Sequence, residues 1–196
     1  MSSKTKIWDS FVENGEVSSA YGYRWRSAFG VDQLDVVLKK LTADSSSRHG
    51  VIMMWKPDED LLKVQKNVPC PVMFTLNIIG GKLSTHLMIR SNDMILGNPT
   101  DIAGYALLTH ILAQKLDVDV GTLTVSISNA HIYENHYEIA EELISRLSKT
   151  KRVDFYLPLD SYDRAVNLKD SLVDEIKAGF KNYLPGPSVG PIKIAL

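Results

Sequence analysis

Four short segments carry side chains that can bind or react with a small ligand. The only cysteine lies in Pro69-Cys70-Pro71, and its thiolate would be a nucleophile. The other three are Arg90-Ser91-Asn92-Asp93, Gly97-Asn98-Pro99-Thr100-Asp101 and the run 129–136, which holds His131 and Tyr133. Each alone has a plainer interpretation, because a lone cysteine or a histidine in an apolar strand is more often a satisfied core residue.

Composition narrows the classes of partner. The 196 residues suffice for one domain with a substantial core, and we expect a single domain over 1–196. The formal net charge of -1 argues against direct nucleic-acid binding, whereas a small anion needs only a local cluster of arginines. One cysteine permits no internal disulfide. The sequence shows neither a signal peptide nor a membrane-spanning run, so we expect no membrane partner and a cytoplasmic location, in the host if the gene belongs to a phage.

Hydrophobic periodicity predicts both helices and strands in the first half. Residues 31–41 place Val31, Leu34 and Leu41 on one helical face, and 51–55 are typical of a short buried strand. Runs 71–79 and 82–90 flank Gly80-Gly81, which predicts a hairpin.

The second half continues this mixture. Residues 102–116 predict a long, largely apolar and buried helix; 120–128 predict a strand, 135–148 an amphipathic helix, and 152–157 another strand. The proline-rich end of the chain is expected to be an irregular arm. The pattern as a whole indicates an α+β domain with a mixed β-sheet and one long helix packed on it.

Taken together, the reactive segments resemble the thymidylate synthase family in order and spacing. The resemblance rests on the cysteine motif, Arg-Ser-x-Asp, Leu-Gly-x-Pro, Ile-Ala-x-Tyr-Ala-Leu-Leu and His-x-Tyr. Earlier matches are Ile7-Trp8-Asp9, Tyr21-Gly22, Trp25-Arg26, Asp32-Gln33-Leu34 and Ser47-Arg48. It implies the thymidylate synthase fold and a homodimer packed through its sheets. It also implies that the family's usual N-terminal segment, with a loop arginine and a catalytic glutamate, is missing; Asp9, Glu13, Glu16 or an altered water network are the candidates to replace that glutamate.

The resemblance assigns roles to particular residues. Cys70 would attack C6 of a pyrimidine, and Arg90 would lower the thiol pKa and contact the phosphate of a nucleoside monophosphate. Ser91 would add a phosphate contact, and Arg48 would reach the phosphate of the partner subunit. His131 and Tyr133 would hold the sugar hydroxyl. Trp8, Asp93 and Gly97 match positions near the folate, so the implied cofactor is 5,10-methylenetetrahydrofolate or a related reduced pterin.

Asp101 stands where thymidylate synthases carry the asparagine that reads uracil. A carboxylate lacks the amide donor that O4 of uracil needs, whereas the exocyclic amine of cytosine can donate to it. This exchange resembles the phage dCMP hydroxymethylases, and a dCMP hydroxymethyltransferase is the first hypothesis. A dCMP methyltransferase, a thymidylate synthase that tolerates Asp101 and a non-catalytic nucleotide-binding homologue remain alternatives.

Three further positions depart from the family pattern. Pro71 replaces a histidine, His49 replaces the second arginine of an Arg-Arg pair, and Ile89 replaces a common glutamine. The loss of the histidine agrees with a different substituent at C4 of the base, or with simple drift, and His49 weakens the match at the phosphate site.

Overall fold

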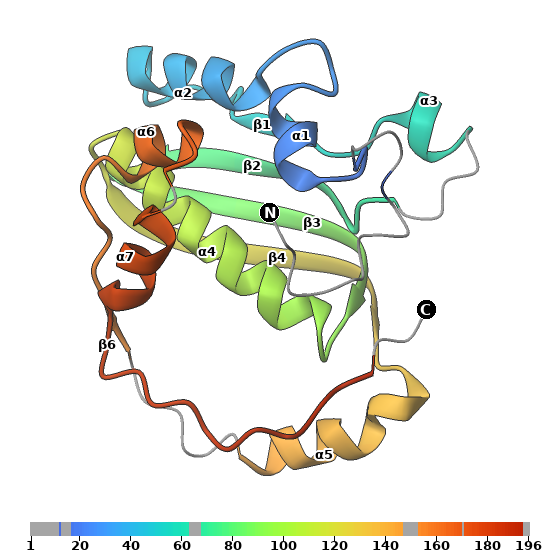
Figure 1. Cartoon of the computed structure of the whole chain (residues 1–196). Helices are drawn as coiled ribbons and strands as arrows, with labels where there is room; N and C mark the ends of the chain where they lie inside the picture. The colour runs from blue at the N-terminus through green and yellow to red at the C-terminus, as the bar shows by residue number, and fades with distance from the viewer. Residues whose placement is uncertain (1–11, 13–16, 63–67, 147–152, 170, 194–196) are drawn as a thin grey trace.

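A four-stranded mixed sheet forms the centre of the molecule (Figure 1). The computed structural model describes residues 12, 17–62, 68–146, 153–169 and 171–193. The strands are β1 (Val51–Met53), β2 (Pro71–Ile79), β3 (Lys82–Asp93) and β4 (Asp119–His131), in the spatial order β1-β2-β3-β4. The pairs β1–β2 and β2–β3 are antiparallel, whereas β4 runs parallel to β3. The predicted α+β class and mixed sheet are therefore confirmed.

Two connections explain this topology. Gly80 and Gly81 join β2 to β3 with φ values of 58° and 74°, and a two-residue turn with positive φ at both positions suits a hairpin. A parallel strand pair requires a crossover, which the helix α4 (Gly97–Lys115) supplies between β3 and β4. The first part of this crossover carries candidate site residues, since β3 ends at Asp93 and α4 begins at Gly97.

Helices α2 (Gln33–Ala43) and α4 cover one face of the sheet. Their buried residues share a core with Phe74, Leu76 and Leu87, none of which is exposed to solvent. Along β3 the alternate side chains point the other way, and His86 and Met88 are exposed there. The opposite face of the sheet is thus open in the described part of this chain.

The remaining elements are short and lie around this sheet. They are α1 (Tyr21–Arg26), α3 (Pro57–Asp60), the 3-10 helix η2 (Glu134–His136), α5 (Tyr137–Ser145), β5 (Asp154–Phe155), α6 (Ser161–Val166), α7 (Ser171–Gly179) and β6 (Phe180–Lys181). Figure 1 shows the arm after β6 running beside α5. Among the residues that the structure describes, no helix is long and apolar enough to cross a membrane.

Several predictions of where helices and strands begin and end, and of which residues are buried, were wrong. Helix α2 begins after Asp32, whose side chain caps it by accepting from the Asp35 backbone N–H at 3.0 Å, so Val31 is outside the helix and 45% exposed. Only one side of α4 faces the sheet, and Ile102 on another side is 42% exposed. Of the strand expected over 152–157, the described residues 153–157 form only β5. The described part of the helix expected over 135–148 is η2 followed by α5.

Candidate functional site

Cys70 lies at the entrance to β2, directly beside Arg90 of β3. The backbone N–H of Arg90 donates to the carbonyl oxygen of Cys70 at 3.0 Å, which fixes the two residues across the strand pair. The cysteine side chain is half-buried and belongs to no disulfide. The structure therefore brings together the thiol and the guanidinium that the sequence separates by twenty residues.

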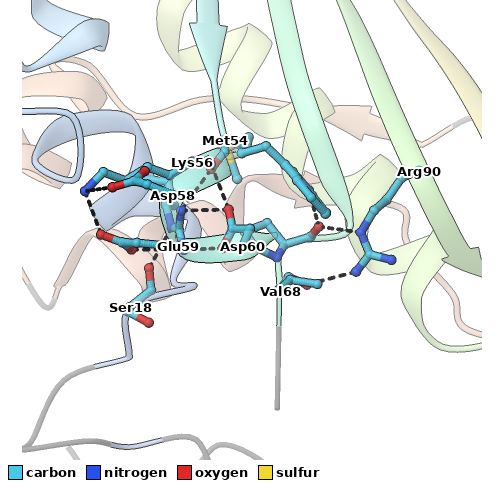
Figure 2. Close-up of polar contacts among 11 residues, drawn as sticks. Ser18, Met54, Lys56, Asp58, Glu59, Asp60, Val68 and Arg90 are labelled. Atoms are coloured by element: carbon cyan, nitrogen blue, oxygen red, sulfur yellow. Dashed lines mark hydrogen bonds and ion pairs between the residues drawn. The ribbon is translucent and has the colours of Figure 1, made fainter. Parts of the chain in front are cut away.

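The Arg90 side chain is held by the segment that precedes the cysteine. Its Nε donates to the carbonyl oxygen of Pro69 at 3.1 Å, and a terminal nitrogen donates to the carbonyl oxygen of Val68 at 3.2 Å (Figure 2). The Trp55 indole donates to the same Pro69 oxygen at 2.9 Å, and its ring centre lies 5.4 Å from the guanidinium carbon. The positive charge is thus anchored beside Cys70 by backbone acceptors and an aromatic face.

A buried ion pair supports the chain next to this segment. Arg24 of α1 donates two hydrogen bonds to Asp60 at 2.9 and 2.8 Å, and the exposed fraction of both side chains is 0%. Asp60 also accepts from the backbone N–H of Lys56, the residue just before α3, at 2.8 Å (Figure 2). The same carboxyl therefore stabilises the start of α3 and binds α1. Bidentate arginine–carboxylate geometry compensates much of the desolvation that such burial requires.

The electrostatic state of the thiol differs from the sequence-based expectation. Burial raises the pKa of Cys70 above its ordinary value; the Arg90 charge opposes this, and Asp101 and Asp93 add to it. Arg90 therefore acts in the expected direction, but desolvation outweighs it. The thiol is neutral at neutral pH in the free chain, and a bound ligand that offsets the negative charge of Asp101 would favour the thiolate.

Asp101 lies in the first turns of α4, close enough to Cys70 for their charges to interact. It is 9% exposed, and burial raises its pKa while a hydrogen bond from Asn92 acts the other way. Asn92 Nδ2 donates to Asp101 Oδ2 at 3.0 Å, and Asn98 Nδ2 donates to Asn92 Oδ1 at 2.6 Å. A carboxyl that reads a base and a nucleophile that attacks it need this proximity.

Tyr21 is a site residue that sequence reasoning did not assign. Its hydroxyl contacts the Cys70 backbone, and burial, Asp101 and Cys70 raise its pKa far above the usual value. The phenol is therefore a neutral hydrogen-bonding group within the same cluster as the thiol and the carboxyl. The resemblance included Tyr21-Gly22, so the signal was present in the sequence without a role attached to it.

The proposed phosphate ligands do not all meet within one chain. Ser91 follows Arg90 on β3 and is half-buried opposite Asn129 of β4. Arg48 lies in the loop between α2 and β1, is exposed, and has no hydrogen-bond or ion-pair partner among the described residues. This placement accords with a role outside its own subunit.

His131 and Tyr133 are neighbours, although the strand ends at the first of them. Their rings meet edge to face with centroids 5.1 Å apart, and His131 Nδ1 lies 3.1 Å from Asn129 Oδ1. They line an open depression of ≈ 680 Å³ formed by residues 131–135 and 137. A sugar hydroxyl could be bound at this surface, which lies at the end of β4.

The C-terminal arm returns to this same corner. His136 is fully buried, and its Nε2 lies 2.8 Å from the carbonyl oxygen of Lys193, which also accepts from Asn135 at 3.2 Å. Farther along, Arg146 donates to the carbonyl oxygen of Pro187 at 2.6 Å. The arm is therefore fastened beside Tyr133, where a closing segment could exclude water from a bound ligand.

The residues matched to the folate position are only partly described. Asp93 Oδ1 accepts from the backbone N–H groups of Ile95 and Leu96 at 2.9 and 3.3 Å, which shapes the turn into α4. Its Oδ2 accepts from no described residue, so it fits the N–H donors of a reduced pterin. A Cβ at Gly97 would meet Asn92 and Asp93 at an ordinary 3.6 Å, so no steric need for glycine arises in this chain. Trp8 and the possible glutamate substitutes Asp9, Glu13 and Glu16 lie outside the described residues.

Together the fold and site define an α+β protein with a mixed sheet and a free thiol beside an arginine and a nearly buried carboxyl. The family model described as thymidylate synthase matches residues 1–192. A thymidylate synthase from Francisella philomiragia is 34% identical over 203 residues, which cover 95% of this chain and 70% of that protein. The chain belongs to the thymidylate synthase family.

Family membership supports a general activity. It supports transfer of a one-carbon unit from methylenetetrahydrofolate to C5 of a pyrimidine nucleotide, and proteins of this family are usually dimers. The named relative is a thymidylate synthase, so the finer choice of base and product depends on the residues of this site.

Proposed function

We propose that this protein transfers a one-carbon unit to C5 of a cytosine nucleotide, with dCMP 5-hydroxymethylation as the reaction. The observation that carries the proposal is the position of Asp101. Its carboxyl is nearly buried, within electrostatic reach of Cys70, and one oxygen is already occupied by Asn92. A carboxylate acceptor there complements the exocyclic amine of cytosine and opposes O4 of uracil.

The reaction begins at Cys70. Its thiolate adds to C6 of the base, and the electron pair of the C5–C6 double bond moves to C5, which becomes nucleophilic. Methylenetetrahydrofolate, when bound, supplies the electrophilic carbon that C5 attacks. In hydroxymethylation, the C5 proton would then be lost while the bond between the transferred carbon and the folate nitrogen breaks, so that tetrahydrofolate leaves. Water would add its oxygen to that carbon, and the C6–sulfur bond would break to return the thiolate. Arg90 favours the thiolate form of Cys70 both when it attacks C6 and when it is released at the end of the reaction.

The remaining groups would bind the substrate. Arg90 and Ser91 would contact the phosphate, and Arg48 would reach it from the partner subunit. Arginine suits a phosphate monoester because its planar fork can bind two oxygens. His131 and Tyr133 would contact the sugar hydroxyl. The close contact of their rings keeps the imidazole and the phenol next to each other.

A homodimer is part of this proposal. The sheet face that bears His86 and Met88 is exposed in the single chain, and such a face can form an isologous interface with a second copy. Arg48 lies in the loop before β1, at the edge of that sheet.

The second candidate function is thymidylate synthesis from dUMP. Two observations favour it: the similar protein from Francisella is a thymidylate synthase, and burial raises the pKa of Asp101. A protonated Asp101 could donate to O4 of uracil, and hydride rather than water would then complete the reaction.

Incubation with labelled formaldehyde, tetrahydrofolate and either dCMP or dUMP distinguishes these functions. We expect label in 5-hydroxymethyl-dCMP, and none when Cys70 is replaced by alanine. Label in thymidylate alone would reject the cytosine assignment. Nucleotide binding without any product would instead indicate a non-catalytic homologue.

A further inference from the structure

Asn92 lies between the base-reading carboxyl and the start of α4. It sits near the end of β3, opposite Ala130 of β4, and only 1% of it is exposed. Its amide makes two hydrogen bonds at once, donating to Asp101 and accepting from Asn98. Asn98 and Asp101 are three residues apart in α4, so they project from neighbouring positions toward the same strand residue.

The direction of this chain of hydrogen bonds follows from the chemistry of its members. An ionised carboxyl can only accept, so Asn92 must turn its NH₂ group toward Asp101. The carbonyl oxygen of Asn92 then faces Asn98, which must donate its own NH₂. The 2.6 Å bond from Asn98 is compatible with this orientation of the Asn92 amide and stabilises it.

We propose that Asn92, oriented by Asn98, is a positioning residue that determines base specificity by donating to one oxygen of Asp101. With Oδ2 occupied, Oδ1 is the oxygen left for the base, and it accepts from the amine of cytosine. The inference rests on the proposed function, because it assumes that residue 101 reads the base.

The groups around Asp101 are consistent with an ionised carboxyl that accepts hydrogen bonds from both Asn92 and the base. The titratable groups that act on Asp101 from neighbouring elements are Tyr21 of α1, Cys70 before β2 and Tyr105 of α4. Burial raises the pKa of each of them, so all three are neutral near neutral pH. The donated hydrogen bond from Asn92 is thus the main interaction in the described site that favours the ionised acceptor form of Asp101.

Exchanging the amide and the carboxyl between positions 92 and 101 tests the role of Asn92. The readout is the preference for dCMP or dUMP, not the stability of the protein. In Asp101→Asn, Asn92 would donate to the new carbonyl, and the new NH₂ would face the base, so preference should shift to dUMP. In the double variant Asn92→Asp with Asp101→Asn, the carboxylate at position 92 accepts from both neighbours. The carbonyl of the amide introduced at position 101 then faces the base, and preference should return to dCMP.

Binding of dCMP and dUMP would be measured by calorimetry at pH 7.5 on the full chain, with Asn167→Leu at the exposed end of α6 as a remote control. We expect the ratio of the two dissociation constants to change by about tenfold or more in each direction, as for other base-edge contacts. A double variant that still prefers dUMP would overturn the role of Asn92. If Asp101→Asn leaves the ratio unchanged, residue 101 does not read the base and the proposed function itself fails. Asn98→Leu should reduce the wild-type preference, and an unchanged ratio there would reject its orienting role.

Discussion

The ring centre of Trp55 lies 5.4 Å from the guanidinium carbon of Arg90, and both side chains donate to the carbonyl oxygen of Pro69. That carbonyl belongs to the residue immediately before Cys70. An indole, a guanidinium and the backbone of the nucleophile segment are therefore joined at one acceptor, and this arrangement sets where the positive charge stands relative to the thiol.

Replacing Trp55 should make the thiol less reactive. Trp55→Leu removes both the aromatic face and the N–H donor, so Arg90 would be less well held; Trp55→Phe removes only the donor. We expect alkylation of Cys70 by iodoacetamide at pH 8 to slow by about threefold to tenfold in the leucine variant and by less in the phenylalanine variant. Trp25→Phe, which removes an indole donor from the core, is the control. Equal rates in wild type and Trp55→Leu would contradict this positioning role.

The pH dependence of the same reaction tests the balance between burial and charge at the thiol. Burial raises the pKa of Cys70, so the thiolate becomes abundant only at alkaline pH and the alkylation rate should keep rising beyond about pH 9. Arg90→Met removes the charge that lowers this pKa, so its curve should move to still higher pH.

Because the chain has one cysteine, the alkylation signal belongs to Cys70 alone. Arg164→Met is the matched control, since it removes an arginine that pairs with Glu175 on remote helices. A curve for Arg90→Met that coincides with that of the control would show that Arg90 does not act on the thiol.

Much of this site could be predicted from the sequence. Alternating apolar residues and the Gly80-Gly81 pair predicted the hairpin that brings Arg90 beside Cys70, because strand pairing follows local pattern and turn chemistry. The apolar run after Asp101 predicted a helix over 102–116; the observed helix begins earlier, at Gly97, and therefore includes Asp101. These features depend on residues near one another in the chain.

Features that depend on distant residues were not predicted. The pairing of Arg24 with Asp60 joins two short helices that have no clear periodicity, so neither helix was expected. The raised pKa of Cys70 reflects burial, which composition and spacing do not reveal. The hydrogen bonds of Asn92 likewise require the three-dimensional approach of β3 and α4.

Breaking the buried ion pair should destabilise the protein strongly. Arg24→Met leaves Asp60 charged without its partner in a site that excludes water, which typically costs about 3–5 kcal/mol of the free energy of unfolding. Urea denaturation followed by circular dichroism measures the change. The double variant Arg24→Met with Asp60→Leu should recover much of the loss, because apolar groups can replace a buried pair at little cost. Additive losses in the double variant would argue against direct coupling of the two residues.

The exposed position of Arg48 yields a test of the proposed shared site. If Arg48 serves the partner's phosphate, Arg48→Ala and Cys70→Ala each inactivate a homodimer, but a hybrid of the two contains one site with both native residues. After subunit exchange in an equal mixture, half of the dimers are hybrids, so activity should return to about a quarter of the wild-type level. Mixing Cys70→Ala with Cys70→Ser is the control and should restore nothing. If tagged subunits demonstrably exchange and the first mixture stays inactive, Arg48 does not act across an interface, and the phosphate must be bound by residues of a single chain.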